Sequence, residues 1–87
     1  MRRKQGFISH KVEDKNYIVA VGENSKKYNC IITCNDTALF IWNQLEQDCS
    51  REDLVEAMQE KYGIDADTAS RAVEKILSIL GENMLLE

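Results

Sequence analysis

Tyr28–Leu45 reads YNCIITCNDTALFIWNQL, and this stretch decides the fold that the sequence predicts. Its first half is a run of β-branched and thiol residues, which is typical of a β-strand. Asn35 then supplies a helix N-cap, and Asp36 places an acid in the first helical turn. The following apolar residues recur with helical spacing and cover most of the circumference, as in a central helix packed on two sides. We therefore predict a strand over 29–34 and a central helix over 36–47.

The length and composition favour one small globular domain over 1–87. The chain has 87 residues, 44% of them hydrophobic, which is enough for a single modest core. It contains no apolar run near the roughly 20 residues that a membrane span requires, and no signal-peptide pattern. We expect a soluble, cytoplasmic protein that does not bind a membrane.

Charge divides the chain into two halves. Residues 1–34 carry seven Lys or Arg against three Asp or Glu, a balance of +4, whereas 35–87 carry four against twelve, a balance of −8. The predicted sheet half is therefore basic and the helical half acidic, which bears on the partners that each can attract. The basic lead-in 1–5 is expected to fray, with a contact arm for an acidic partner as the alternative.

The remaining strands precede the central stretch. Residues 6–12 and 17–21 have strand character and flank a polar turn at 13–16, so they predict a hairpin. With 29–34 they form a three-stranded antiparallel meander, in which the last strand lies at an edge. An apolar edge without lysine or proline invites pairing with another strand. The alternatives are that the chain's own loop or a dimer mate covers this edge.

Two more helices follow, over 51–62 and 66–81. Ser50 and Asp53 form a capping-box pair, Gly63 ends the first helix, and Asp65 caps the second. The tight connection makes a helix–turn–helix arrangement. We predict an α+β fold, winged-helix-like, with the three-stranded antiparallel sheet packed on a three-helix bundle.

The last two helices each have an apolar stripe, and the second also has an unusual flank. The predicted buried residues of the first are Leu54, Val55, Met58 and Tyr62, and those of the second are Ala66, Ala69, Val73, Ile76, Leu77 and Leu80. Outside the second stripe lie Thr68, Ala72, Lys75 and Ile79. This flank predicts a shallow apolar wall with a positive edge, unless it is a widening of the core stripe. Residues 84–86 are expected to fold back onto the core.

The sequence predicts no catalysis, cofactor or metal site. It lacks a nucleophile–base set, paired carboxylates in a cleft and a glycine-rich phosphate loop. The single histidine, His10, is expected to be a half-exposed strand residue. Cys30 and Cys34 would lie roughly 13 Å apart along one strand, too far for a disulfide or a shared metal. We expect them to be buried thiols and Cys49 to be exposed.

Three binding functions remain after this exclusion. A winged-helix DNA-binding regulator is the alternative that the fold class suggests, but the predicted recognition helix is acidic and would repel phosphates. An assembly adaptor would keep its edge strand paired in a dimer. Peptide capture by strand addition uses the open edge for backbone pairing and a neighbouring wall for side-chain selection. Lys26, Lys27, Lys75 and Arg71 would then favour an acidic guest.

Three segments carry a resemblance to a known family. They are NCIITCNDTALFIWNQL (29–45), SREDLVEAMQEKYGID (50–65) and AVEKILSILGENMLL (72–86). Together they resemble the PqqD family of peptide chaperones, also called RiPP recognition elements, which act on ribosomally made and post-translationally modified peptides. Cys34 departs from the family pattern, which often has an aliphatic residue there.

The resemblance implies a winged-helix-like fold and a non-enzymatic role. It implies that the leader segment of a precursor peptide binds as an added strand between strand three and helix three, and is delivered to a modifying enzyme, commonly a radical SAM maturase. Apart from the resemblance, we expect that no nucleic acid binds and that the protein is a monomer or a weak homodimer. The matching binding positions are Asn29, Cys30, Ile31, Ile32 and Thr33 on the strand and Thr68, Arg71, Ala72, Lys75 and Ile79 on the helix, with Ile31, Ala72 and Ile79 expected to supply apolar selectivity.

Overall fold

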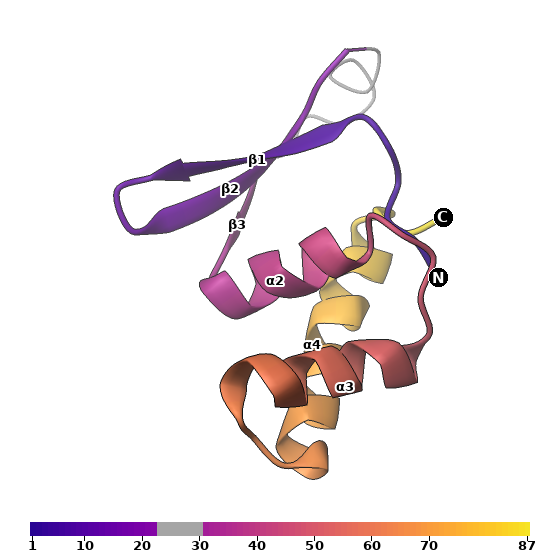
Figure 1. Cartoon of the computed structure of the whole chain (residues 1–87). Helices are drawn as coiled ribbons and strands as arrows, with labels where there is room; N and C mark the ends of the chain where they lie inside the picture. The colour runs from indigo at the N-terminus through magenta and orange to yellow at the C-terminus, as the bar shows by residue number, and fades with distance from the viewer. Residues whose placement is uncertain (23–30) are drawn as a thin grey trace. The chain divides into compact units, whose positions relative to one another are not determined.

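The computed structural model describes residues 1–22 and 31–87 (Figure 1). These residues form two compact units, one comprising Lys4–Phe40 and the other Met1–Arg3 with Ile41–Glu87. The first contains the sheet and is called the sheet unit. The second contains helices and both chain ends and is called the helical unit. The boundary between them falls within helix α2 (Asp36–Gln44).

The sheet unit contains three antiparallel strands in the order β1-β2-β3. The strands are β1 (Phe7–Val12), β2 (Lys15–Ala20) and β3 (Ile31–Cys34). This arrangement confirms the predicted meander. The predicted turn at 13–16 is wrong in extent, because β2 already begins at Lys15. Only Glu13 and Asp14 connect β1 to β2, and Glu13 adopts a positive φ of 59°, as two-residue hairpin loops commonly require.

The burial of Asn16 explains why β2 begins at Lys15 and not at residue 17, where the sequence predicted its start. Its side chain is 1% exposed, and its Nδ2 donates to Asp36 Oδ1 at 2.7 Å. A buried amide needs such a partner, and Asp36 provides it from the first turn of α2. Asn16 Oδ1 is buried without a hydrogen-bond partner among the described residues. The bond therefore connects β2 with the start of the helix that follows β3.

Helix α2 begins where the sequence predicts and ends earlier. The Ala38 N–H donates to Asn35 Oδ1 at 2.8 Å, which is the expected N-cap. The helix ends at Gln44 rather than at residue 47. The Glu46 N–H bonds Asn43 O at 3.3 Å, so the chain tightens to an i−3 pattern and leaves the α-helical path.

The helical unit contains α3 (Arg51–Tyr62) and α4 (Ala66–Glu82), whose ends are fixed by local caps. Ser50 and Asp53 form the predicted capping box, with bonds of 3.1 and 2.9 Å. Gly63 takes the left-handed conformation and donates to Gln59 O at 2.9 Å. The Thr68 N–H donates to Asp65 Oδ1 at 2.7 Å. In the described part of the chain, no helix has the length and apolar character needed to cross a membrane.

The core of the helical unit follows most of the predicted stripes. Its buried residues are Ile41, Trp42, Leu45, Leu54, Met58, Ala69, Val73, Ile76, Leu80 and Leu85. Four predicted core residues are more accessible: Ala66 is exposed, Tyr62 is 40% exposed, and Val55 and Leu77 are half-buried. Tyr62 and Ala66 flank the turn between α3 and α4, where fewer side chains are available to cover them.

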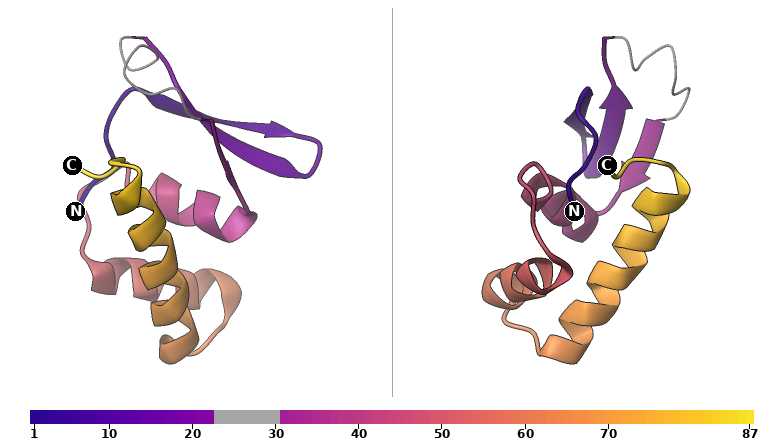
Figure 2. Two further views of the ribbon diagram at one scale, coloured as in Figure 1. Left: turned by 180° about the vertical axis from the view of Figure 1, so that it is seen from behind. Right: turned by 90° about the vertical axis from the view of Figure 1, so that its right-hand side faces the viewer.

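The N-terminal segment is ordered by backbone pairing, so the expectation that it frays is wrong. The Arg3 N–H donates to Leu45 O at 3.0 Å, and Arg3 also forms a β-bridge with Leu86. The Arg3 guanidinium lies 4.9 Å from the centroid of the Trp42 ring, a cation–π geometry. The two chain ends therefore lie side by side in the helical unit (Figure 2).

Two substitutions in the C-terminal segment test how much core packing contributes to the stability of the helical unit. Leu85 is fully buried and its neighbour Met84 is 65% exposed. Replacing Leu85 with Ala should lower the free energy of unfolding by about 2–5 kcal/mol, because it leaves a cavity. The matched substitution Met84→Ala should change it by less than about 0.5 kcal/mol. Urea denaturation measures both, and equal losses would contradict this description of the core.

Candidate functional site

The candidate site is built from the open edge of β3. In antiparallel sheets, residues alternate between bonding one neighbouring strand and bonding the other. The Val21 N–H donates to Gly6 O at 2.8 Å, in register with the β1–β2 pairs. The odd-numbered residues of β2 therefore bond β1, and its even-numbered residues, Asn16 and Ile18, bond β3.

The same alternation assigns the groups at the edge. Ile32 and Cys34 lie opposite Ile18 and Asn16, so their N–H and C=O groups bond β2. Those of Ile31 and Thr33 then point away from the sheet. No strand within residues 1–22 and 31–87 pairs with that side of β3. The sheet thus offers the main-chain donors and acceptors of two residues to a further strand.

Some of the predicted edge lies outside the described residues. Asn29 and Cys30, which were predicted to belong to the binding strand, fall there, as do the cationic residues Lys26 and Lys27. Thr33 is exposed. The described part of the edge therefore consists of the backbone of β3 alone.

The second candidate surface is the flank of α4 in the helical unit. Thr68 and Lys75 are exposed, Ile79 is 42% exposed, and Ala72 is half-buried. An isoleucine with this exposure belongs to the surface, so the flank is distinct from the core stripe. Lys75 forms no ion pair with any described residue, which leaves its charge available. The prediction that one guest contacts both this flank and β3 stays a prediction.

Arg71, at the margin of the flank, is already paired. Its guanidinium lies 2.7 Å from Asp67 Oδ2, one turn earlier on α4. An exposed i, i+4 pair of this kind is weak, so Arg71 remains accessible to a stronger anionic partner. Among the predicted cations that are described, Lys75 is therefore the better candidate for attracting an acidic guest.

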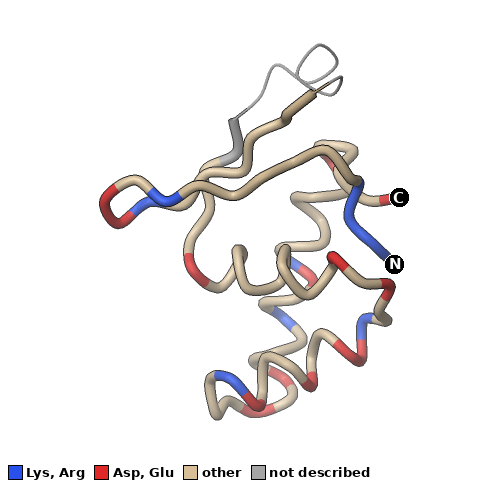
Figure 3. Tube along the Cα trace, turned by 45° about the horizontal axis from the view of Figure 1, so that its top comes forward, with Lys and Arg blue, Asp and Glu red and all other residues tan. Residues whose placement is uncertain are grey.

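The charges of α3 and α4 do not suit nucleic acid. Acidic residues recur along both helices (Figure 3), and Arg51 is engaged with Ser70 and Glu74 across the helix pair. A DNA-binding helix needs cations facing the phosphates. Helix α4, the predicted recognition element, does not provide such a face.

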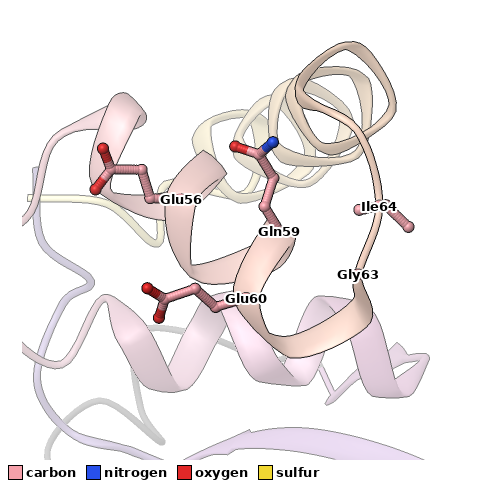
Figure 4. A pocket seen from close by; sticks show the side chains of 5 residues that line it. All are labelled: Glu56, Gln59, Glu60, Gly63 and Ile64. Carbon is pink, nitrogen blue, oxygen red and sulfur yellow. The ribbon is translucent and has the colours of Figure 1, made fainter.

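A shallow, open hollow lies beside the end of α3. It is lined by Glu56, Gln59, Glu60, Gly63 and Ile64 (Figure 4). Its lining offers two carboxylates, and no group of three potential metal ligands occurs among the described residues. The hollow shares no residue with the β3 edge or the α4 flank. No sequence motif predicted a binding or catalytic role for its lining residues.

Cys34 and Cys49 are both partly buried, whereas Cys34 was expected to be buried, and Cys30 lies outside the described residues. Burial raises the pKa of the Cys34 thiol above its usual value, and the charge of Asp36 adds to the effect. Cys49 was expected to be exposed but is partly buried, with its Sγ 3.7 Å from Gln44 O. Burial also raises the pKa of the Cys49 thiol, so neither is activated as a nucleophile.

Comparisons with known proteins bear on the family and the fold. The model of a family described as "Coenzyme PQQ synthesis protein D (PqqD)" matches residues 18–86. No curated protein sequence matches the chain. A solved structure of TbiB1 in complex with the TbiA(beta) leader peptide is similar, with a TM-score of 0.75 and 22% sequence identity over 100% of this chain and 95% of that chain. This likeness confirms the predicted fold class.

Amide exchange tests which groups of β3 face outward. In the protein without a guest, the Thr33 amide should exchange with solvent at least tenfold faster than the Ile32 and Cys34 amides, because only the latter are bonded within the sheet. Hydrogen–deuterium exchange followed by NMR gives the rates residue by residue. Protection of Thr33 equal to that of its two neighbours would show that the edge is already paired.

Proposed function

This chain belongs to the PqqD family, and from that premise we propose that it is a non-catalytic peptide chaperone for a ribosomally made precursor. It binds the leader segment of the precursor and presents it to a modifying enzyme. The observation that carries the proposal is the open β3 edge, where the groups of Ile31 and Thr33 lack a partner strand among the described residues. The leader-peptide complex of TbiB1, which shares the fold, supports the choice of guest.

Affinity in this proposal comes mainly from backbone pairing. A guest in extended conformation adds a strand beside β3 and bonds the outward N–H and C=O groups of Ile31 and Thr33. Asn29, Cys30 and Ile32 complete the proposed strand site. Because main-chain groups are common to all sequences, this pairing gives little selectivity, and the side chains around it must supply the discrimination.

Selectivity comes from the flank of α4. Ala72 is small enough to admit a guest side chain, and Ile79 presents apolar surface that the guest can cover. Lys75, with Arg71 at the margin, attracts acidic guest residues, and Thr68 extends the flank toward the start of the helix. The guest therefore carries an apolar residue for Ala72 and Ile79 and a nearby carboxylate.

The receiving partner in this proposal is a radical SAM maturase, as the family resemblance implies. The chaperone holds the leader, and the maturase acts on the rest of the precursor. The complex forms in the cytoplasm, where ribosomal precursors are released. Division of labour of this kind lets one enzyme accept the precursor without a leader site of its own.

Replacing Thr33 with Pro tests strand addition directly. The substitution removes an N–H that the sheet itself does not use, so the fold should persist. It should weaken binding of a synthetic leader peptide, taken from the precursor gene next to the gene of this chain, by at least about 1 kcal/mol, or roughly fivefold in Kd. Thr33→Val, which keeps the N–H and the side-chain shape, should bind like the parent.

Calorimetry gives both affinities. Unchanged binding by Thr33→Pro would place the guest on another surface.

Replacing Ile79 with Asp tests the proposed selective surface. Loss of an apolar anchor and repulsion of an acidic guest should weaken leader binding by about 1–3 kcal/mol. Ser78→Asp is the matched control, since Ser78 is the exposed neighbour on the same helix and receives the same charge. Equal effects of the two substitutions would show that α4 acts only through its net charge.

A further inference from the structure

The end of α4 is closed by a backbone motif in which Met84 takes an unusual conformation. The Met84 N–H donates to Gly81 O at 3.1 Å, and the Leu85 N–H donates to Leu80 O at 2.9 Å. These two bonds form the Schellman pattern, with Met84 at the C′ position. Its φ of 57° lies in the left-handed region, where glycine is favoured because a Cβ atom crowds the backbone. Methionine therefore makes this turn less stable than glycine would.

The end of α3 shows the ordinary solution to the same problem. Gly63 ends that helix with a φ of 62°, and its N–H donates to Gln59 O. Glycine adopts this conformation without strain, since it has no Cβ atom. The chain thus uses glycine at one left-handed helix end and methionine at the other.

Core packing does not account for the methionine. The Met84 side chain is 65% exposed, more than any other large hydrophobic residue that the structure describes. Leu80 and Leu85, the two positions whose apolar contact accompanies this motif, are 4% and 0% exposed. A residue that strains the backbone and adds little to the core points to a function.

Met84 lies at the end of the α4 flank. The backbone N–H and the side-chain Nδ2 of Asn83 both donate to Ile79 O, at 3.2 and 2.8 Å, so Asn83 lies one helical turn beyond Ile79. Met84 is the next residue, where the chain turns back at the end of the helix (Figure 2). Because Ile79 is 42% exposed, the helical unit presents two exposed apolar side chains little more than one turn apart.

We propose that Met84 is a specificity-determining residue of the guest site, where it contacts a large apolar side chain of the leader. This role rests on the proposed function and extends its selective surface from Ile79 past the end of α4. Methionine suits the role because its unbranched thioether side chain adapts to different shapes and packs well against the edges of aromatic rings.

Replacing Met84 with Gly should stabilise the fold and weaken binding. Glycine relieves the left-handed turn, so the melting temperature followed by circular dichroism should rise by about 2–6 °C. In calorimetry, the Kd for the synthetic leader peptide should increase at least about fivefold, because the apolar contact is lost. Met84→Leu keeps both the apolar bulk and the strain, so its Kd should stay within about twofold of the parent.

Gly63→Ala is the matched control for the backbone. It places a side chain at the left-handed end of α3, where an added Cβ meets nothing within 4 Å beyond its chain neighbours in the described part of the chain. Its effect is therefore that of the conformation alone, and the melting temperature should fall by about 2–6 °C. The Kd for the leader should stay within about twofold of the parent.

Oxidation tests the contact without any substitution. Hydrogen peroxide converts accessible methionine to its sulfoxide, and Met84 and Met1 are 65% and 39% exposed. Saturating leader peptide should slow the oxidation of Met84 at least about threefold, because the bound guest shields the thioether. The rate at Met1 should not change and serves as the internal reference. Peptide mass spectrometry gives both rates.

The outcomes separate this inference from the proposed function. If the parent chain does not bind the leader, both are wrong. If Thr33→Pro weakens binding but Met84→Gly does not, or the leader leaves Met84 oxidation unchanged, the guest site stands and Met84 lies outside it. A lower melting temperature for Met84→Gly would show that the methionine serves the fold, and would also overturn the inference.

Discussion

A strand with only one neighbour in an antiparallel sheet can bond only half of its backbone groups. This constraint governs β3, whose even-numbered residues bond β2 and whose odd-numbered residues face outward. The groups of Ile31 and Thr33 gain partners only when something extended lies beside them. Exposed edges are normally blunted by charge or proline, and the described part of β3 has neither. The proposed function depends on these outward-facing groups.

Within each unit, few but specific polar bonds fix the elements. Asn16 bonds Asp36 from the middle strand, and so connects the sheet with the start of the helix after β3. In the helical unit, the caps of α3 and α4 set the ends of the helices, and Arg51 links the pair. These polar contacts supply specificity, while the buried apolar residues supply most of the free energy.

Sequence reasoning succeeded where the signal is local. The caps at Ser50, Gly63 and Asp65 involve residues within a few positions of one another, and α3 and α4 begin where these caps predict. The edge position of β3 also followed from the order of the strands. The α4 flank was recognisable because Ile79 does not share the helical phase of the core.

The errors concern interactions between distant residues. The pairing of Arg3 with Leu86 joins the two chain ends and has no local signature, so the lead-in was expected to fray. Asn16 was assigned to a turn, because the partner that makes its burial possible, Asp36, lies 20 residues away. Identifying the outward-facing residues of β3 required the pairing register between β2 and β3, which neither strand's sequence reveals by itself.

The stacking of Arg3 on Trp42 has a practical consequence for spectroscopy. Trp42 is the single tryptophan of the chain, and it is 1% exposed inside the helical unit. Its emission therefore responds to the solvent exposure of that unit, whereas tyrosine absorbance combines both units, because Tyr17 belongs to the sheet unit and Tyr62 to the helical unit. Both signals can be followed in one melting experiment, and absorbance changes that do not coincide with the change in emission would show that the two units lose their order separately.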